Sequence, residues 1–116
     1  MSFTERRDHR RFTPKEELFA DFDRVTMLRN HWRSHRVRDI SLSGAFIEDA
    51  HPPPGGRQLE IKLWLRASQP LAITSAIRRA EVGQGMGVQF LNMSEDDYDQ
   101  LRSYIIVSRL QGASVA

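Results

Sequence analysis

The stretch VRDISLSGAFIE, residues 37–48, has the pattern of a β-strand that runs into a turn. Two apolar residues, Ile40 and Leu42, alternate with two polar ones, Asp39 and Ser41. Successive side chains of a strand point to opposite faces, so we expect the apolar pair to enter a core and the polar pair to lie side by side toward solvent. The stretch therefore predicts a half-buried strand that presents a carboxylate and a hydroxyl together.

The same alternation occurs elsewhere in the first 93 residues. The residues that we expect to face the core are Leu18, Ala20, Phe22, Leu59, Ile61, Leu63 and Leu65. Trp64 falls on the polar side of its strand, where it is either exposed as part of a partner surface or partly covered by the helix or a neighbouring loop. Period two in several short segments predicts an antiparallel sheet with one buried face.

Turn signals separate these strands at residues 29–31, 52–56, 67–69 and 83–85. The segments 70–82 and 86–92 are expected to pair as a hairpin about the last turn. Closure into a barrel would remove the sheet edges that so short a chain could not otherwise cover. The predicted class is therefore all-β, a small closed barrel.

The strand pattern stops at the sequence SEDD, which begins at Ser94. A serine N-cap followed by acids in the first turn favours a helix, and we expect one over about residues 94–110. Tyr98, Leu101, Ile105 and Leu110 are predicted to share its buried face.

Length and composition restrict the classes of protein. A chain of 116 residues is long enough for one domain. It has no cysteine, which excludes disulfides and thiolate metal sites. No apolar run reaches membrane-spanning length, so we expect a cytoplasmic protein without membrane contact. No arrangement of serine, histidine and acid suggests catalysis, and we expect no enzyme.

Positive charge is concentrated near the beginning of the chain. Ten of the seventeen basic residues but six of the fifteen acids lie in the first 38 positions. The stretch RRDHRR, residues 6–11, places four guanidinium groups in six positions, and arginine suits two-pronged recognition of phosphate or guanine. Residues 1–14 are charged, poor in apolar side chains and ended by a proline, which predicts a flexible arm before the domain. We expect an anionic ligand.

The basic residues allow two other interpretations. The arm could be a disordered tail that contacts phosphates without sequence preference. The run from Arg24 to Arg38, with Trp32 in it, could hold single-stranded nucleic acid, or it could be a solvated hairpin that adds positive potential. His31 and His35 have i, i+4 spacing, but the segment is expected to be a turn and strand with no third ligand, so no metal site is predicted.

Gly44 forms a second group of candidate binding residues with Asp39 and Ser41, in addition to the arginines of residues 6–11. It stands where the strand must turn, either because the backbone needs a positive φ or because another group approaches closely. A carboxylate, a hydroxyl and a bare backbone can bind the Watson–Crick edge of a purine while arginines take phosphates and the O6/N7 edge.

The order of these motifs, with Arg7 and Arg11 separated by three residues and D-x-S-x-x-G following, resembles the PilZ domain, the bacterial receptor for cyclic di-GMP. The stretch MGVQFLNMS, residues 86–94, resembles the family's last strand and its entry into the C-terminal helix.

This resemblance implies a six-stranded antiparallel β-barrel with a C-terminal helix over residues 15–116, and an arm, residues 1–14, that closes over the ligand. It implies that Arg7 and Arg11 bind phosphate and guanine, that Asp39 and Ser41 bind a guanine edge, and that Gly44 permits close approach. Further candidates for contact are Arg6, which suggests a mode with two stacked ligand molecules, and Arg10, Ser43 and Arg79. The implied function is that of a cyclic di-GMP receptor and adaptor that changes the surface shown to an unidentified effector protein; the alternative is a basic nucleic-acid-binding barrel.

Overall fold

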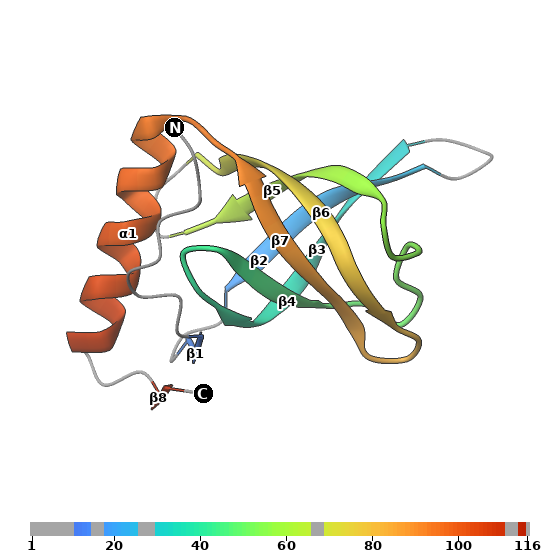
Figure 1. Ribbon diagram of the computed structural model, residues 1–116, viewed down its shortest axis with the longest axis horizontal. Coiled ribbons are helices and arrows are strands. Elements are labelled where there is room, and N and C mark those ends of the chain that lie inside the picture. Colours follow the sequence, from blue (N-terminus) through green and yellow to red (C-terminus); the bar gives the residue numbers. More distant parts are fainter. Residues whose placement is uncertain (1–10, 15–17, 26–29, 66–68, 111–113, 116) are drawn as a thin grey trace.

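The computed structural model describes residues 11–14, 18–25, 30–65, 69–110 and 114–115. Strands alternate with short connections until a single long helix follows them (Figure 1). The elements are β1 (Phe12–Thr13), β2 (Phe19–Val25), β3 (Asn30–Ile40), β4 (Gly44–Glu48), β5 (Gln58–Trp64), β6 (Leu71–Glu81), β7 (Gly85–Asn92), α1 (Glu95–Leu110) and β8 (Ser114–Val115).

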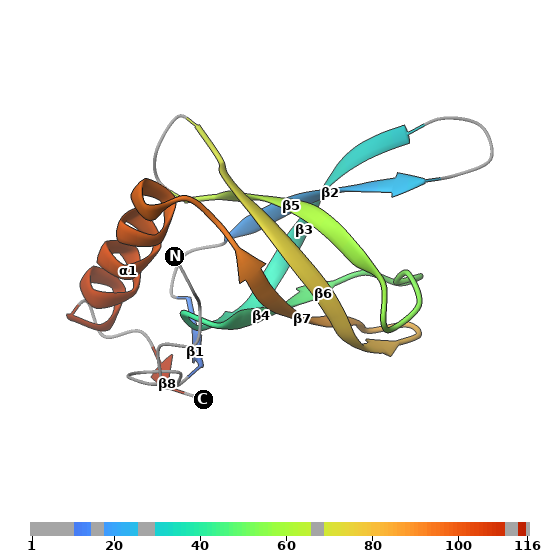
Figure 2. The ribbon, with the colours of Figure 1, turned by 45° about the horizontal axis from the view of Figure 1, so that its top comes forward.

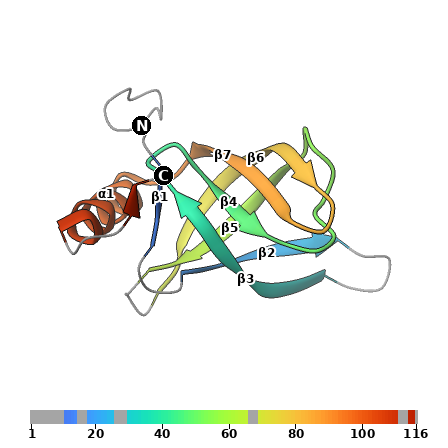
Figure 3. The ribbon, with the colours of Figure 1, turned by 90° about the horizontal axis from the view of Figure 1, so that it is seen from below.

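Six of the strands close into an antiparallel barrel. Their order is β2-β5-β6-β7-β4-β3, and pairing of β2 with β3 joins the two ends of the sheet. Figure 3 shows the barrel from below, with β3 crossing in front. The predicted hairpin of β6 and β7 is present, with its turn at residues 82–84. The predicted six-stranded barrel followed by a helix is confirmed.

Alternation along the strands fills the barrel as the sequence predicts. Leu18, Ala20 and Phe22 are buried, as are Ile61 and Leu63, while Leu59 and Leu65 pack against the same core. On the outside, Trp64 is partly covered, and its Nε1 donates a hydrogen bond to Asp21 Oδ2 at 2.8 Å. The expected partial cover of this tryptophan is therefore present, but the contact comes from β2 and not from the helix or a loop.

The described strand pairings contain three register shifts, and two of them each add an arginine to a strand. In the β3–β4 pairing Val37 lies opposite Ile47 and the next matched pair is Asp39 with Phe46, so Arg38 is an extra residue. In the β6–β7 pairing the register shifts in the same way between Ile77 and Arg79, which makes Arg78 the extra residue. A bulge turns two successive side chains to one side. Arg38 with Asp39, and Arg78 with Arg79, can therefore all lie outside the barrel.

The predicted orientation of Ser41 is wrong. Ile40 and Leu42 are buried as expected, but Ser41 is 1% exposed instead of lying beside Asp39 toward solvent. The reason is that β3 ends at Ile40, so strand alternation no longer sets the direction of the next side chain. Ser41 Oγ instead accepts a hydrogen bond from the Ser43 amide at 3.2 Å and lies 3.4 Å from the Gly44 carbonyl oxygen, to which it donates. The hydroxyl thus holds the β3–β4 turn together.

Gly44 is required by the approach of a neighbouring strand. Its φ is not among the positive values, which among described glycines belong to Gly56, Gly83 and Gly85. A Cβ at Gly44 would lie 2.3 Å from the carbonyl oxygen of Val88 in β7. Of the two reasons considered for this glycine, close approach is therefore the one that applies, and the approaching group is backbone.

The helix α1 covers one end of the barrel, as Figures 1 and 2 show from two directions. Its N-cap is the predicted one, because the Asp97 amide donates to Ser94 Oγ at 3.1 Å. Leu101 and Ile105 are buried in the barrel core and Tyr98 packs against it. Leu110 is 83% exposed, so its assignment to the buried face is wrong; Ser108, one turn after Ile105, is buried on that face.

The last residues of the predicted arm form a short strand. In β1, Phe12 lies opposite Ile40 of β3 and also opposite Val115 of β8. Residues 1–10 lie outside the described residues. In the part of the chain that is described, no helix is both long enough and apolar enough to cross a bilayer.

We expect Gly44→Ala to lower the free energy of unfolding by about 1–3 kcal/mol, the usual range for forcing extra volume into a packed site. The new Cβ would meet backbone, which cannot turn away as a side chain can. Gly87→Ala is the control, because its Cβ would meet Arg79 Cβ at an ordinary 3.9 Å. Urea denaturation of both variants tests this; equal midpoints would show that β4 and β7 can separate freely.

Ser94→Ala should cost about 1 kcal/mol through loss of the N-cap hydrogen bond. Ser103→Ala, an exposed serine inside α1, should leave stability unchanged or raise it slightly, because alanine has the higher helix propensity. Thermal unfolding followed by circular dichroism would compare them, and an equal effect of both substitutions would rule out a specific role for the cap.

Candidate functional site

A hollow of about 630 Å³ lies on the outside of the barrel. It is formed by β6, β7, β4 and β3, which are consecutive in the sheet, and by the residue that precedes β1. Segments far apart in sequence therefore meet here because of the strand order. The lining residues are Arg11, Arg38, Asp39, Ser43, Phe46, Arg78, Arg79, Glu81, Gly87, Val88 and Gln89.

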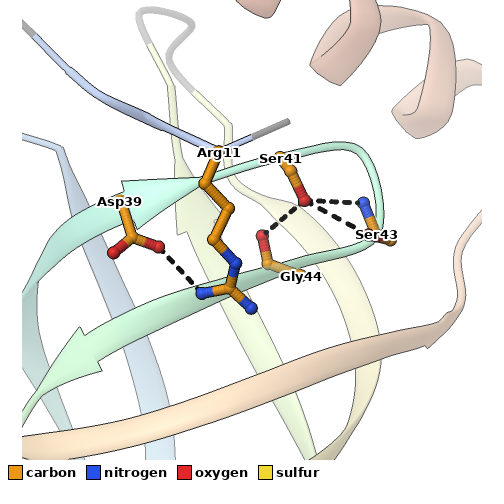
Figure 4. A network of polar contacts seen from close by, with 5 residues as sticks. All are labelled: Arg11, Asp39, Ser41, Ser43 and Gly44. Carbon is orange, nitrogen blue, oxygen red and sulfur yellow. Dashed lines mark hydrogen bonds and ion pairs between the residues drawn. The ribbon is translucent and has the colours of Figure 1, made fainter. Parts of the chain in front are cut away.

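An ion pair joins the end of the arm to β3. Arg11 Nη1 lies 2.8 Å from Asp39 Oδ1, and both side chains remain partly exposed. Figure 4 shows the Arg11 guanidinium reaching across from the chain before β1 toward Asp39, beside Gly44. The antiparallel pairing of Phe12 with Ile40 holds the end of the arm beside the end of β3, from where the long Arg11 side chain reaches Asp39. The two sequence motifs thus meet at one edge of the hollow.

Two other arginines lie over an aromatic ring. The guanidinium carbon of Arg38 is 4.4 Å from the centre of the Phe46 ring, and that of Arg79 is 5.9 Å from it. Both distances are within the range of cation–π attraction. Arg38 also contacts Glu48 at 3.5 Å, and Arg79 contacts Glu81 at 3.7 Å.

The fourth arginine is oriented by an amide. Arg78 Nε donates to Gln89 Oε1 at 2.6 Å. The lining therefore contains four arginines and two carboxylates, Asp39 and Glu81. Positive charge exceeds negative charge around the hollow, so it will attract anions.

The side chains that line the hollow are suited to binding a ligand and do not form an arrangement typical of catalysis. Arginine forks match phosphate oxygens and the O6/N7 edge of guanine, and their planes stack on bases. Asp39 is an acceptor suited to the N–H groups of a purine. The hollow is thus suited to a planar anionic ligand such as a nucleotide.

The structure brings together four of the predicted site residues, Arg11, Asp39, Ser43 and Arg79, which line the hollow. Gly44 adjoins it, because the Arg11 guanidinium lies near the space its Cβ would take. Ser41 is buried under the turn and does not line the hollow. The predicted contacts of Arg6, Arg7 and Arg10 fall outside the described residues.

Sequence reasoning missed Arg38, Phe46, Arg78 and Gln89 as members of the site. Arg38 and Arg78 each follow a buried apolar residue and precede another charged residue, which places two charges in succession where alternation allows one. Such a doublet inside an alternating strand is a signal of a bulge, and bulges often lie beside functional sites. Phe46 gave no such signal, because a single phenylalanine reads as core.

Of the two histidines with i, i+4 spacing, the structure describes the side chain of His35 but not that of His31. The side chains of His31 and Trp32 lie outside the described part of the structure, so the predicted alternatives that involve them remain predictions. His35 stacks on Phe22, with ring centres 4.3 Å apart, and its Nδ1 is 3.0 Å from the Glu48 carbonyl oxygen. Among the described residues no cluster of three or more metal-binding side chains occurs.

Solved structures share this fold. The Bacillus subtilis inhibitor of motility, MotI/DgrA, matches with a TM-score of 0.70 and 16% identity, over 93% of this chain and 53% of that one. The PilZ domain of Escherichia coli YcgR with c-di-GMP matches with a TM-score of 0.68 and 19% identity, over 93% of this chain and 94% of that one. YcgR in complex with c-di-GMP, also from Escherichia coli, gives 0.68 and 18%, over 92% of this chain and 47% of that one. The chain therefore spans about half the length of MotI/DgrA and of the longer YcgR structure.

The sequence itself supplies the family. No curated protein matches the chain. A protein-family model described as the PilZ domain matches residues 5–106. This range includes the arginine motif, the D-x-S-x-x-G motif and most of the helix. PilZ domains are non-catalytic, in agreement with the prediction that the chain is not an enzyme. With a match over nearly its whole length, the chain belongs to the PilZ domain family.

Proposed function

We propose that this PilZ domain is a receptor for cyclic di-GMP and acts as an adaptor. The ligand would occupy the hollow between Arg11 and Arg79, with Asp39 binding a guanine edge. The arm, with Arg6, Arg7 and Arg10, would close over it and supply further guanidinium groups. Closure would change the surface shown to an effector protein. Because the proposed ligand is an intracellular messenger, the proposal includes a cytoplasmic location.

The observation that carries the proposal is the Arg11–Asp39 ion pair at 2.8 Å. It links the end of the arginine motif with the start of the D-x-S-x-x-G motif, which are 28 residues apart in sequence. A phosphate and a guanine of one small ligand could therefore be bound at the same time. The guanidinium, which is 42% exposed, could turn from the carboxylate to a phosphate without losing a buried contact.

Two further observations support the ligand class. Arginines outnumber carboxylates by four to two around the hollow, which suits a ligand with two negatively charged phosphodiester groups. The solved PilZ domain of YcgR, which shares the fold, contains c-di-GMP. Ser41 is buried, and we expect it to act by holding the turn that carries Ser43 and Gly44. A direct contact of Ser41 with the ligand would require this turn to open.

Calorimetric titration with cyclic di-GMP tests the proposal. We expect Arg11→Ala to weaken binding roughly 10- to 100-fold, the effect of losing a charge-assisted hydrogen bond. Arg102→Ala, which removes an exposed arginine of α1, should leave the affinity unchanged. Absence of binding by the parent protein, together with tight, salt-sensitive binding of single-stranded oligonucleotides, would favour the nucleic-acid alternative.

Closure of the arm has a separate test. Addition of cyclic di-GMP should raise the heteronuclear NOE of the backbone amides of residues 2–10, because the arm arginines become bound. In the Arg11→Ala variant, at ligand concentrations that fill the site equally, the rise should be smaller. An arm with equal NOE values before and after saturation would exclude the switch while leaving the receptor function intact.

A further inference from the structure

Phe46 has an unusual position for a buried aromatic residue. Its neighbours in β4, Ala45 and Ile47, are both 1% exposed and belong to the barrel core. Alternation places the Phe46 side chain on the other, outer face of the strand. It is nevertheless only 3% exposed and lines the hollow rather than the core cluster. Something outside the barrel must therefore cover the ring.

Two arginine side chains contribute to this cover, together with the β7 backbone at Gly85. The guanidinium carbon of Arg38 lies over the ring, 4.4 Å from its centre, and that of Arg79 lies 5.9 Å from it. Arg38 reaches this place because it is the extra residue of the β3 bulge, directly opposite the part of β4 that holds Phe46. Its contact with Glu48 Oε2, at 3.5 Å, orients the guanidinium from the side.

The outer face of this stack is accessible. The Arg38 side chain is 43% exposed and lines the hollow, although its guanidinium carbon is only 4.4 Å from the ring centre. A guanidinium plane stacks as readily on a base as on a phenyl ring. The Phe46–Arg38 pair thus offers a flat, positively charged surface to anything that enters the hollow.

We infer that Arg38, supported by the Phe46 ring, is the platform on which one purine base of the ligand stacks. The inference rests on the proposed function and adds a specificity-determining residue to it. Stacking on this platform would come in addition to hydrogen bonding at Asp39, which lies next to Arg38 in the same bulge. Arg79, 66% exposed and farther from the ring, would form the side of the base site and not its floor.

Arg78 provides a matched comparison within the same hollow. It is also an arginine, also the extra residue of a bulge, and also exposed. Its Nε donates to Gln89 Oε1 at 2.6 Å, whereas the described arginines that lie over Phe46 are Arg38 and Arg79. Arg78 therefore contributes positive charge as Arg38 does, but it is not supported by the Phe46 ring.

The decisive experiment compares Arg38→Lys with Arg78→Lys in calorimetric titration of cyclic di-GMP. Lysine keeps the charge but has no plane to stack. We expect Arg38→Lys to weaken binding roughly 5- to 150-fold, the span of base-stacking contributions, and Arg78→Lys to change it less than about threefold. Equal losses in the two variants would overturn the platform while leaving the receptor function in place. No binding by the parent protein would instead overturn both.

A spectroscopic readout separates stacking from general weakening. A cyclic dinucleotide in which 2-aminopurine replaces one guanine would be titrated to saturation, and its fluorescence should fall on binding to the parent and to Arg78→Lys. In saturated Arg38→Lys the quenching should be clearly smaller. Unchanged quenching would place the base elsewhere.

Phe46→Leu tests the support beneath the arginine. If it folds, as shown by its melting temperature, it should reproduce the affinity loss of Arg38→Lys, because the guanidinium is no longer held flat. Retained parental affinity in folded Phe46→Leu would overturn the role of the ring. If the variant does not fold, the two lysine variants still decide the inference, since their side chains lie outside the core.

Discussion

A strand of a closed barrel can present only every second side chain on its outer face, because the others must fill the core. A dense group of charges cannot be built from such strands without breaking the alternation. The two bulges at Arg38 and Arg78 do so in strands that lie on either side of β4 and β7. Each bulge adds one arginine to the outer face without removing an apolar residue from the core. The charge of the hollow depends on these two extra residues.

Three of the four arginines of the hollow are each paired with a carboxylate. Arg11 is paired with Asp39, Arg38 with Glu48 and Arg79 with Glu81, all through side chains that are partly exposed. Exposed pairs contribute little to stability, so exchanging a carboxylate for a phosphate costs little. The pairs hold the guanidinium groups in place before the ligand arrives, which reduces the entropy lost on binding. Ion pairing of these arginines and affinity for an anion are thus compatible.

The sequence was a good guide wherever one local rule acted alone. Alternation identified the buried residues of β2 and β5, and the serine and acids at Ser94 located the start of α1. Prediction failed where strand alternation or the buried face of the helix ended at a residue that the sequence does not mark. Ser41 follows the last residue of β3 and turns inward to hold the turn, and Leu110 lies at the last turn of α1, where the barrel no longer covers the helix. The site was found in part, through Arg11, Asp39, Ser43 and Arg79, because its motif residues are polar where a core would need apolar ones.

By itself, then, the sequence determined the all-β class, the terminal helix, the family resemblance and the two motifs, since each depends on residues near one another in the chain. Tertiary structure alone decided that Arg11 meets Asp39, that a carbonyl of β7 requires glycine at Gly44, and that Phe46 is covered by Arg38 and Arg79. These contacts depend on strand order and on the register of each pairing. Register is set by barrel closure and by the bulges, and both are properties of the whole sheet that no single segment contains.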